Sequence, residues 1–221
     1  SKYALGVANG TDALEISLYA LTRLDHYRKE VIVPAATFVA SVSAIVREGL
    51  TPVFCDVDDK FVLDPEEVAK RITPNTLAIM AVHFQGQPCD VKSLVPLAEQ
   101  NDIFLIEDAA QALDAAVDGK MCGTFGEFGC FSFHPQKNLN CIGDGGAIVS
   151  KENYRHLDKY RNHGMSSRDT YEYFGRNSRL DSLNALYLSA NLPKLHDWNN
   201  RRIAVAKLYD DELSQINGIT I

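Results

Sequence analysis

Short apolar runs alternate along the chain with longer segments in which apolar residues recur at helical spacing. The runs are rich in Val, Ile, Leu and Phe, as buried strands are. We expect strands at residues 31–33, 52–54, 77–82, 103–106 and 146–149. Parallel strands need a long crossover connection, usually a helix, so this alternation predicts a parallel sheet with helices on both faces.

Capping residues and glycines mark the ends of the expected helices. Thr11 or Asp12 can cap a first helix that runs to about residue 24, and Gly49 can end a second helix that follows Thr37. Further helices are expected after Asp64, at 90–100, 151–162 and 181–191, and from Pro193 to about 213. We therefore expect an α/β core over 1–150, a helical part over 151–215, and the first strand of a second domain in 216–221.

Composition and charge limit the classes of partner that the protein can have. The chain has 221 residues, of which 46% are apolar and 23% charged, as in ordinary globular proteins. Its net charge of −7 disfavours nucleic acid and anionic membranes as partners, and no apolar run approaches the ~20 residues of a membrane span. The five cysteines form no CxxC pair, which favours free thiols and a cytoplasmic location, and no cluster has metal-ligand spacing.

The carboxyl ends of the expected strands carry the candidate chemistry, since ligands of parallel α/β sheets bind there. Gly10, just before a helix start, suits a phosphate group, although a capped helix explains it equally well. The glycines match neither a dinucleotide fingerprint nor a P-loop. Glu107 and Asp108 end a buried strand, where carboxylates are costly unless paired, and the small residues after them leave room for a flat ligand. Helix capping by Asp108 is the alternative.

Lys137 stands alone between an aromatic-flanked serine and a glycine-rich turn. Apolar surroundings lower the pKa of a lysine and make it a candidate for imine formation with a carbonyl. A surface-loop lysine is the alternative. The polar segment 175–181 precedes an expected helix, and capping by itself accounts for it.

The order of these features, a phosphate site, a strand-end carboxylate and then a lysine, is typical of pyridoxal 5'-phosphate (PLP) enzymes with the aspartate-aminotransferase fold. The individual sequence motifs point to a narrower group of these enzymes. The segments NGTDAL, PAATFVASVSAIVREGLTPVFCDVD, EDAAQA, FSFHPQKNL, GDGGAIV and GRNSRLD resemble the DegT-type nucleotide-sugar aminotransferases. The resemblance implies the large PLP-binding domain over 1–215, a mostly parallel sheet between helices, without the family's opening segment and most of its small C-terminal domain.

The resemblance also implies roles for individual residues. Lys137 is expected to bind the cofactor covalently and to move protons in catalysis. Asp108 is expected to pair with the pyridine nitrogen, Gln111 to hydrogen-bond the phenolic oxygen, and Phe38 to lie over the ring. The phosphate is expected to be held by Gly10, Thr11, Asp12 and Ser132.

Asn177 matches a family asparagine that reaches the phosphate of the neighbouring subunit, which implies a homodimer with shared active sites. A related dehydratase branch has a histidine in place of the lysine. Because Lys137 is present here, close to His134, the aminotransferase branch is favoured. His83 lies in a segment that resembles a family segment, but this chain has Gln85 where the family has a tyrosine, and this departure disfavours a substrate contact there.

The resemblance thus implies an aminotransferase that converts a keto group of a nucleotide-linked sugar to an amine, with glutamate as the amino donor. Such enzymes serve amino-sugar biosynthesis for cell-surface polysaccharides or secondary metabolites. A PLP-dependent sugar dehydratase on the same scaffold is one alternative. A non-catalytic module of the same fold with a regulatory or binding role is another.

Overall fold

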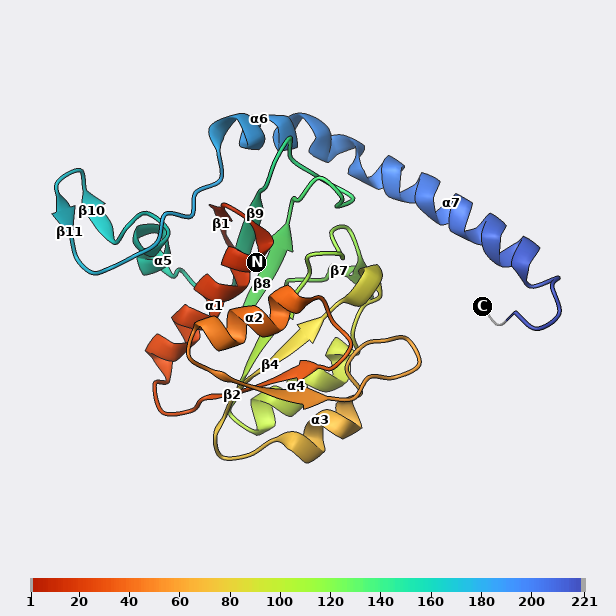
Figure 1. Ribbon diagram of the computed structural model, residues 1–221, viewed down its shortest axis with the longest axis horizontal. Helices are drawn as coiled ribbons and strands as arrows, with labels where there is room; N and C mark the ends of the chain where they lie inside the picture. Colours follow the sequence, from red (N-terminus) through yellow and green to blue (C-terminus); the bar gives the residue numbers. More distant parts are fainter. Residues whose placement is uncertain (1, 220–221) are drawn as a thin grey trace.

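The computed structural model describes residues 2–219 and is built on a seven-stranded sheet (Figure 1). The strand order is β1-β9-β8-β5-β4-β2-β3. The strands are β1 (Tyr3–Val7), β2 (Glu30–Pro34), β3 (Thr51–Cys55), β4 (Thr76–Val82), β5 (Phe104–Asp108), β8 (Phe128–Ser132) and β9 (Gly146–Ser150). Strand β9 runs antiparallel to both neighbours, and the other adjacent pairs are parallel. The expected mostly parallel α/β sheet is confirmed.

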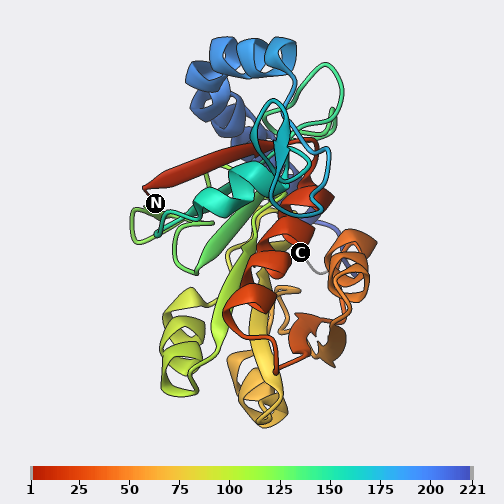
Figure 2. The same ribbon diagram turned by 90° about the vertical axis from the view of Figure 1, so that its left-hand side faces the viewer.

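Helices cover both faces of the sheet (Figure 2). One core joins the sheet to α1 (Gly10–Leu24), α2 (Val39–Arg47) and α5 (Arg155–Tyr160), and the other joins it to α3 (Pro65–Arg71) and α4 (Val91–Gln100). Side chains of β5 alternate between the two cores, with Ile106 in the first and Leu105 in the second. The central strands are therefore apolar on both faces, which explains their continuous runs in the sequence.

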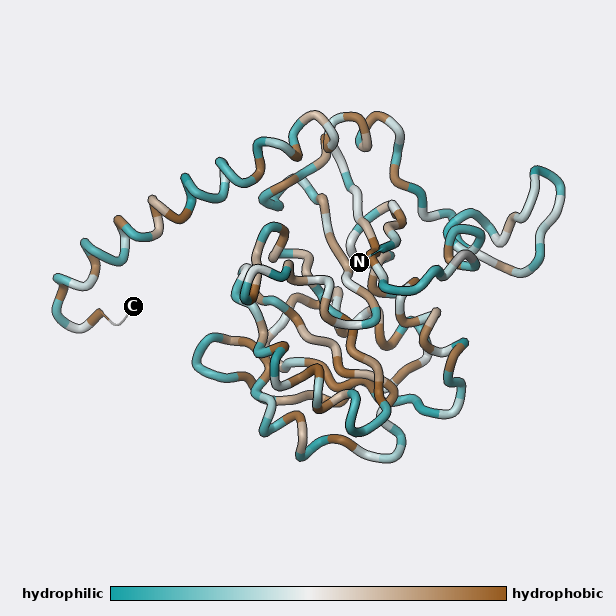
Figure 3. The backbone as a smooth tube through the Cα atoms, turned by 180° about the vertical axis from the view of Figure 1, so that it is seen from behind, coloured by the Kyte–Doolittle hydropathy of each residue, from teal (hydrophilic) through white to brown (hydrophobic). Residues whose placement is uncertain are grey.

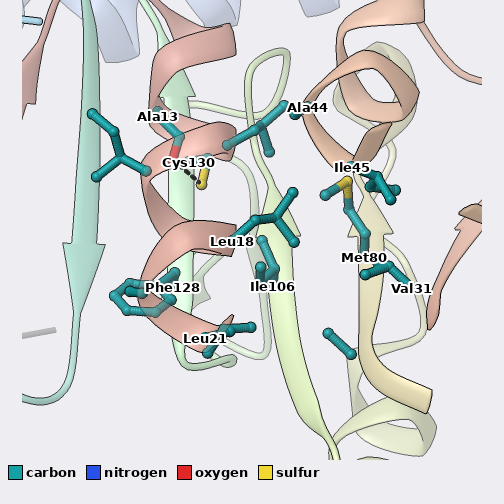
Figure 4. Packing of buried hydrophobic residues seen from close by; sticks show 14 of the residues in the cluster. Ala13, Leu18, Leu21, Val31, Ala44, Ile45, Met80, Ile106, Phe128 and Cys130 are labelled. Carbon is teal, nitrogen blue, oxygen red and sulfur yellow. Dashed lines mark hydrogen bonds between the residues drawn. The ribbon is translucent and has the colours of Figure 1, made fainter. Parts of the chain in front are cut away.

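The first core is closely packed between α1, α2 and the central strands (Figure 4). Leu18 and Leu21 of α1 are completely buried on the side of the sheet that carries Ile106 and Phe128, and Ile45 of α2 is completely buried beside Met80. Each such side chain contributes about 1.5–3 kcal/mol to stability. This packing fixes the first turns of α1 and α2, which reach the site described below.

The remaining elements extend from this core. They are the hairpins β6 (Ala116–Val117) with β7 (Lys120–Met121) and β10 (Met165–Ser167) with β11 (Thr170–Tyr171), the helices α6 (Ser182–Asn191) and α7 (Leu195–Leu213), and the 3₁₀ turns η1 (Phe84–Gly86) and η2 (Leu192–Lys194). Helix α7 projects away from the sheet (Figure 1), and hydrophobic and hydrophilic positions alternate along it (Figure 3).

Several expectations from the sequence need correction. The five expected strands and the helices of 1–150 are present, but strands β1 and β8 were not predicted. The helix expected at 151–162 is wrong in extent: α5 covers only Arg155–Tyr160. Positive φ angles at His163 and Gly164 turn the chain into the β10–β11 hairpin instead.

The first helix is capped two to three residues earlier than expected, at Asn9. Helix α1 begins at Gly10, and the side chain of Asn9 accepts the hydrogen bond from the backbone N–H of Asp12, so neither Thr11 nor Asp12 is the cap. The strand expected to begin in 216–221 is not formed as far as Ile219, and residues 220–221 lie outside the described part of the chain. The division into domains stays a prediction.

A buried ion-pair cluster ties the segment after β11 to the first two helices. The side chain of Glu15, in α1, is only 1% exposed and pairs with Arg176 and, at 3.0 Å, with Arg47. Arg176 also pairs with Glu48 at the end of α2. Because an unpaired buried charge is costly, Arg176 is expected to be important for stability.

We predict that Arg176→Met destabilises the fold by about 3 kcal/mol, since it removes one partner from buried Glu15 and Glu48. The measurement is urea unfolding followed by circular dichroism. The matched control is Arg201→Met, which removes the exposed pair with Asp197 one turn earlier in α7 and should change stability little. Equal unfolding midpoints for the two variants would contradict the prediction.

Candidate active site

The site lies where three neighbouring parallel strands end. In the sheet register, Asp108 at the end of β5 lies between Val82 of β4 and Cys130 of β8. A cavity of about 390 Å³ opens at this edge and also contacts the first turn of α1 and the segment before α2. Of the residues predicted for the site, the cavity is lined by Gly10, Thr11, Phe38, Asp108, Gln111, Ser132 and Lys137. Asp12 and Asn177 are not among its lining residues.

Asp108 is almost completely buried, with 6% of its surface exposed. Its Oδ2 accepts a hydrogen bond of 2.8 Å from the Ser41 hydroxyl, and its Oδ1 accepts one of 3.2 Å from the backbone N–H of Ala110. Burial raises the pKa of Asp108, while these hydrogen bonds, His83 and Lys137 act against the rise. A cationic partner in the cavity would therefore be strongly favoured.

Lys137 supplies an amine to the same cavity. Burial lowers the pKa of Lys137, and the nearby Asp108 partly opposes that effect. Within residues 2–219, the Lys137 ammonium donates no hydrogen bond and joins no salt bridge. The turn that carries it is fixed, because the Lys137 N–H donates to the His134 carbonyl at 2.8 Å. An uncommitted amine with a lowered pKa is suited to nucleophilic chemistry.

The start of α1 gives the cavity an end that is suited to an anion. Asn9 occupies the Asp12 N–H, which leaves the backbone N–H groups of Gly10 and Thr11 available at the positive end of the helix. A Cβ atom on Gly10 would lie 2.7 Å from the Cβ of Ser132, so only glycine lets the helix start come this close to β8. Asp12 offers the cavity no side chain, and its predicted contact with phosphate gains no support.

Gln111 is oriented by a neighbouring turn. Its Oε1 accepts a hydrogen bond of 2.6 Å from the backbone N–H of Gln85, a residue with φ of 52° in η1. The amide NH₂ of Gln111 is then the group free to donate into the cavity. Phe38 precedes α2 with 66% of its surface exposed, at the cavity wall. Gln85 could not be linked to Gln111 from the sequence.

Glu107 has a structural role that the sequence did not show. Its Oε1 accepts hydrogen bonds from the N–H groups of Phe125 and Gly126, and its Oε2 accepts one from Gly123, at 2.6–2.7 Å. Burial raises the pKa of Glu107, but the His83 hydrogen bond and the backbone donors outweigh it, and the net shift is downward. Glu107 thus holds the loop before β8 against β5.

His83 completes that buried network. Its Nδ1 accepts a hydrogen bond from the Cys89 N–H, so Nε2 carries the proton donated to Glu107, each at 3.0 Å. Both ring nitrogens are therefore engaged, and the imidazole has no free nitrogen to contact a substrate. Ser41 is the other residue missed from the sequence; it is completely buried and contacts Asp108.

Asn177 lies outside the cavity on an anchored segment. The residue before it is fixed by the ion pairs of Arg176, and the residue after it by the Ser178 hydroxyl, which accepts a hydrogen bond from the Ala8 N–H. Asn177 itself forms an isolated bridge with Asn162 and is exposed. Asn177 is thus exposed and does not line the cavity of its own chain.

Comparison with known proteins agrees with this geometry. The model of the DegT/DnrJ/EryC1/StrS aminotransferase family matches residues 1–221. The chain belongs to this family. It is 42% identical over 214 residues to the UDP-N-acetyl-3-dehydro-alpha-D-glucosamine 3-aminotransferase of Acidithiobacillus ferrooxidans, a match that covers 96% of this chain and 58% of that protein.

Solved structures confirm the fold of this DegT/DnrJ/EryC1/StrS family member. The crystal structure of DesV from S. venezuelae has a TM-score of 0.90 and 39% identity, over 100% of this chain and 59% of DesV. The structure of NtdA from Bacillus subtilis with bound cofactor PMP has a TM-score of 0.88 and 29% identity, over 97% of this chain and 49% of that one. The chain spans roughly three-fifths of the length of the first two proteins.

The cavity of this family member fits a flat phosphorylated cofactor. It combines an available amine, a buried carboxylate, and a helix start that only glycine allows to approach β8. Among residues 2–219 no group of three or more His, Cys, Asp and Glu side chains is placed to hold a metal ion. Over the same residues no helix is both long and apolar enough to cross a membrane.

We predict that Glu107→Gln destabilises the fold by about 2 kcal/mol near neutral pH, because an amide cannot accept all four hydrogen bonds. A carboxyl group with a lowered pKa stabilises the fold above its unfolded pKa and loses that effect as pH falls through the folded pKa. The difference from wild type should therefore shrink as pH falls below about 4.5, the ordinary value. Urea unfolding at a series of pH values measures it.

The matched control for this prediction is Glu99→Gln, at an exposed position of α4. It should unfold at nearly the wild-type urea concentration at every pH. A Glu107→Gln variant with a constant deficit across the acid range would show that the carboxylate charge is not what stabilises the loop before β8.

Proposed function

We propose that this chain is the cofactor-binding part of a PLP-dependent aminotransferase that converts a keto group of a nucleotide-linked sugar to an amine. The observation that carries the proposal is the pair of Lys137 and Asp108 in one cavity, an uncommitted amine with a lowered pKa beside a buried carboxylate. Family membership agrees with it. The assignment of individual residues rests on the geometry and on the resemblance of the motifs.

Lys137 and Asp108 have complementary tasks in this proposal. When bound, PLP supplies a carbonyl carbon that captures amines and a ring that withdraws electrons from the captured group. Asp108 would keep a proton on the ring nitrogen, since an ion pair is strong where water is excluded. The Nζ of Lys137, with a lowered pKa, would bind the cofactor and accept and return the proton that amine transfer moves.

The rest of the cavity would hold and orient the cofactor. The N–H groups of Gly10 and Thr11 and the Ser132 hydroxyl would bind the phosphate at the start of α1. The amide NH₂ of Gln111, oriented by Gln85, would donate to the phenolic oxygen. Phe38 would cover one face of the ring.

The relatives suggest the substrate class. The protein from Acidithiobacillus ferrooxidans is a 3-aminotransferase named for a UDP-linked 3-dehydro sugar. We infer a nucleotide-linked keto-sugar as acceptor for this chain, an amino acid, glutamate, as donor, and a place in amino-sugar biosynthesis. The five buried free cysteines favour the reducing cytoplasm. An assay with a nucleotide-linked keto-sugar separates this reaction from the dehydratase alternative. The aminotransferase adds an amine to the sugar, whereas the dehydratase removes water from it.

A homodimer would complete the site. Asn177 is exposed on an anchored segment outside its own cavity, and Phe174, three residues earlier, is fully exposed to solvent. An exposed phenylalanine beside a fixed polar residue suits a contact with a second copy. Two-fold symmetry would then place Asn177 of each copy at the phosphate of the other, in two equivalent sites.

We predict that Lys137 is the residue that PLP modifies. After borohydride reduction of the loaded protein, peptide mapping should find the cofactor on Lys137, because this lysine shares the cavity with Asp108. Lys137→Ala should lose both the label and amine transfer with glutamate, while its circular dichroism stays that of wild type. The control Lys151→Ala changes an exposed lysine and should keep both. Label on any other lysine would contradict the assignment.

We predict that two variants, each inactive by itself, recover activity when they are mixed, if the active site is shared between subunits. Lys137→Ala should be inactive for lack of the amine, and Asn177→Trp because its bulk blocks the partner's phosphate site. A mixed dimer has one site with both wild-type residues, so mixing should recover part of the activity. Native mass spectrometry checks that subunits have exchanged. Confirmed exchange without recovered activity would rule out the shared site.

A further inference from the structure

We propose that Ser41 is a positioning residue for Asp108, and that Thr37, Ser41 and Asp108 form one directed chain of hydrogen bonds. The Ser41 hydroxyl donates to Oδ2 of Asp108 at 2.8 Å and lies 2.9 Å from the Thr37 hydroxyl. The bond to Asp108 uses the Ser41 proton, so Thr37 is the donor to Ser41. The direction runs from the cavity wall through a buried hydroxyl to the carboxylate.

The Ser41 hydroxyl makes its hydrogen bonds only within this chain of hydrogen bonds, among the residues that the structure describes. Its side chain is completely buried in the first turn of α2, and its oxygen has Thr37 and Asp108 as partners. A serine is an average helix former and gains nothing from burial unless it is hydrogen-bonded. A serine in this core is therefore explained by the carboxylate it contacts.

Each oxygen of the Asp108 carboxylate accepts a hydrogen bond from a different donor. Ser41 binds Oδ2 and the Ala110 N–H binds Oδ1, so both oxygens are fixed and the plane of the group is set. Each oxygen keeps a further lone pair for a donor in the cavity. The ring nitrogen of a bound cofactor would meet a carboxylate that is already oriented, which reduces the cost of binding it.

Other groups also face Asp108, and their effects are separable from that of Ser41. His83 and Lys137 favour the charged carboxylate, while burial disfavours it, and the thiol of Cys130 lies next to it on β8. Glu107 points to the opposite face of the sheet. None of these contacts includes the Ser41 hydroxyl, so removing that hydroxyl tests one contribution alone.

The catalytic meaning of this chain of hydrogen bonds rests on the proposed function, but its test does not. Aspartate carboxyl carbons are labelled with ¹³C in cofactor-free protein, and the Asp108 signal is identified by its loss in Asp108→Asn. Ser41→Ala should raise the pKa of Asp108 by roughly one unit or more, because a hydrogen bond that favours the charged form is lost. Thr37→Val should raise it less, since it only weakens the Ser41 bond.

The matched control is Ser17→Ala, which removes another completely buried serine hydroxyl, one that contacts Cys130 rather than Asp108. It should leave the pKa of Asp108 at the wild-type value. An unchanged Asp108 pKa in Ser41→Ala overturns the proposal. If Ser41→Ala does not fold, the test uses Thr37→Val, at the partly exposed end of the hydrogen-bond chain. An unchanged Asp108 pKa in Thr37→Val then overturns the proposal. Failure of PLP to bind the wild-type chain would count against the proposed function and not against this result.

Discussion

Two adjacent carboxylates at the end of a central strand are the constraint around which this site is built. Alternation along β5 sends Glu107 to one face of the sheet and Asp108 to the other, so each must be stabilised by a different environment. Glu107 receives three backbone N–H groups and His83, which satisfies it within the protein. Asp108 receives two donors and faces the cavity, so it retains capacity for a ligand. One carboxylate stabilises the fold and the other is available for chemistry.

Close backbone contacts shape the end of the cavity at the start of α1. Strand β9 returns antiparallel beside β8 and brings Gly146 against the start of α1, where a Cβ would lie 2.4 Å from the Asn9 carbonyl oxygen. Gly10 makes the same kind of approach to Ser132. The two glycines allow the positive end of α1 and the hydroxyl at the end of β8 to face one cavity. Side chains at either position would push the helix away from the sheet.

The sequence predicted the parts of the fold whose signal is local. Strands β2 to β5 each contain a short apolar run, and Asp64 and Asp90 cap α3 and α4 as the sequence predicts. Strand β8 was missed because it contains Gly129, which is needed where a Cβ would lie 1.9 Å from the Gly123 carbonyl oxygen, a contact invisible in the sequence. The motif order led to Lys137 and Asp108. Ser41 and Gln85 act through contacts with residues far along the chain, and only the structure could reveal them.

The segment that carries Asn177 is linked to the same two helices that line the cavity. Arg176 joins Glu15 of α1 and Glu48 at the end of α2, whereas the first turns of these helices contribute Gly10 and Ser41 to the site. The core packing of both helices against the sheet makes them rigid elements, so the position of Asn177 relative to its own cavity is fixed. In the proposed dimer, this rigidity would keep Asn177 in register with the phosphate site of the second copy, in both of the equivalent sites.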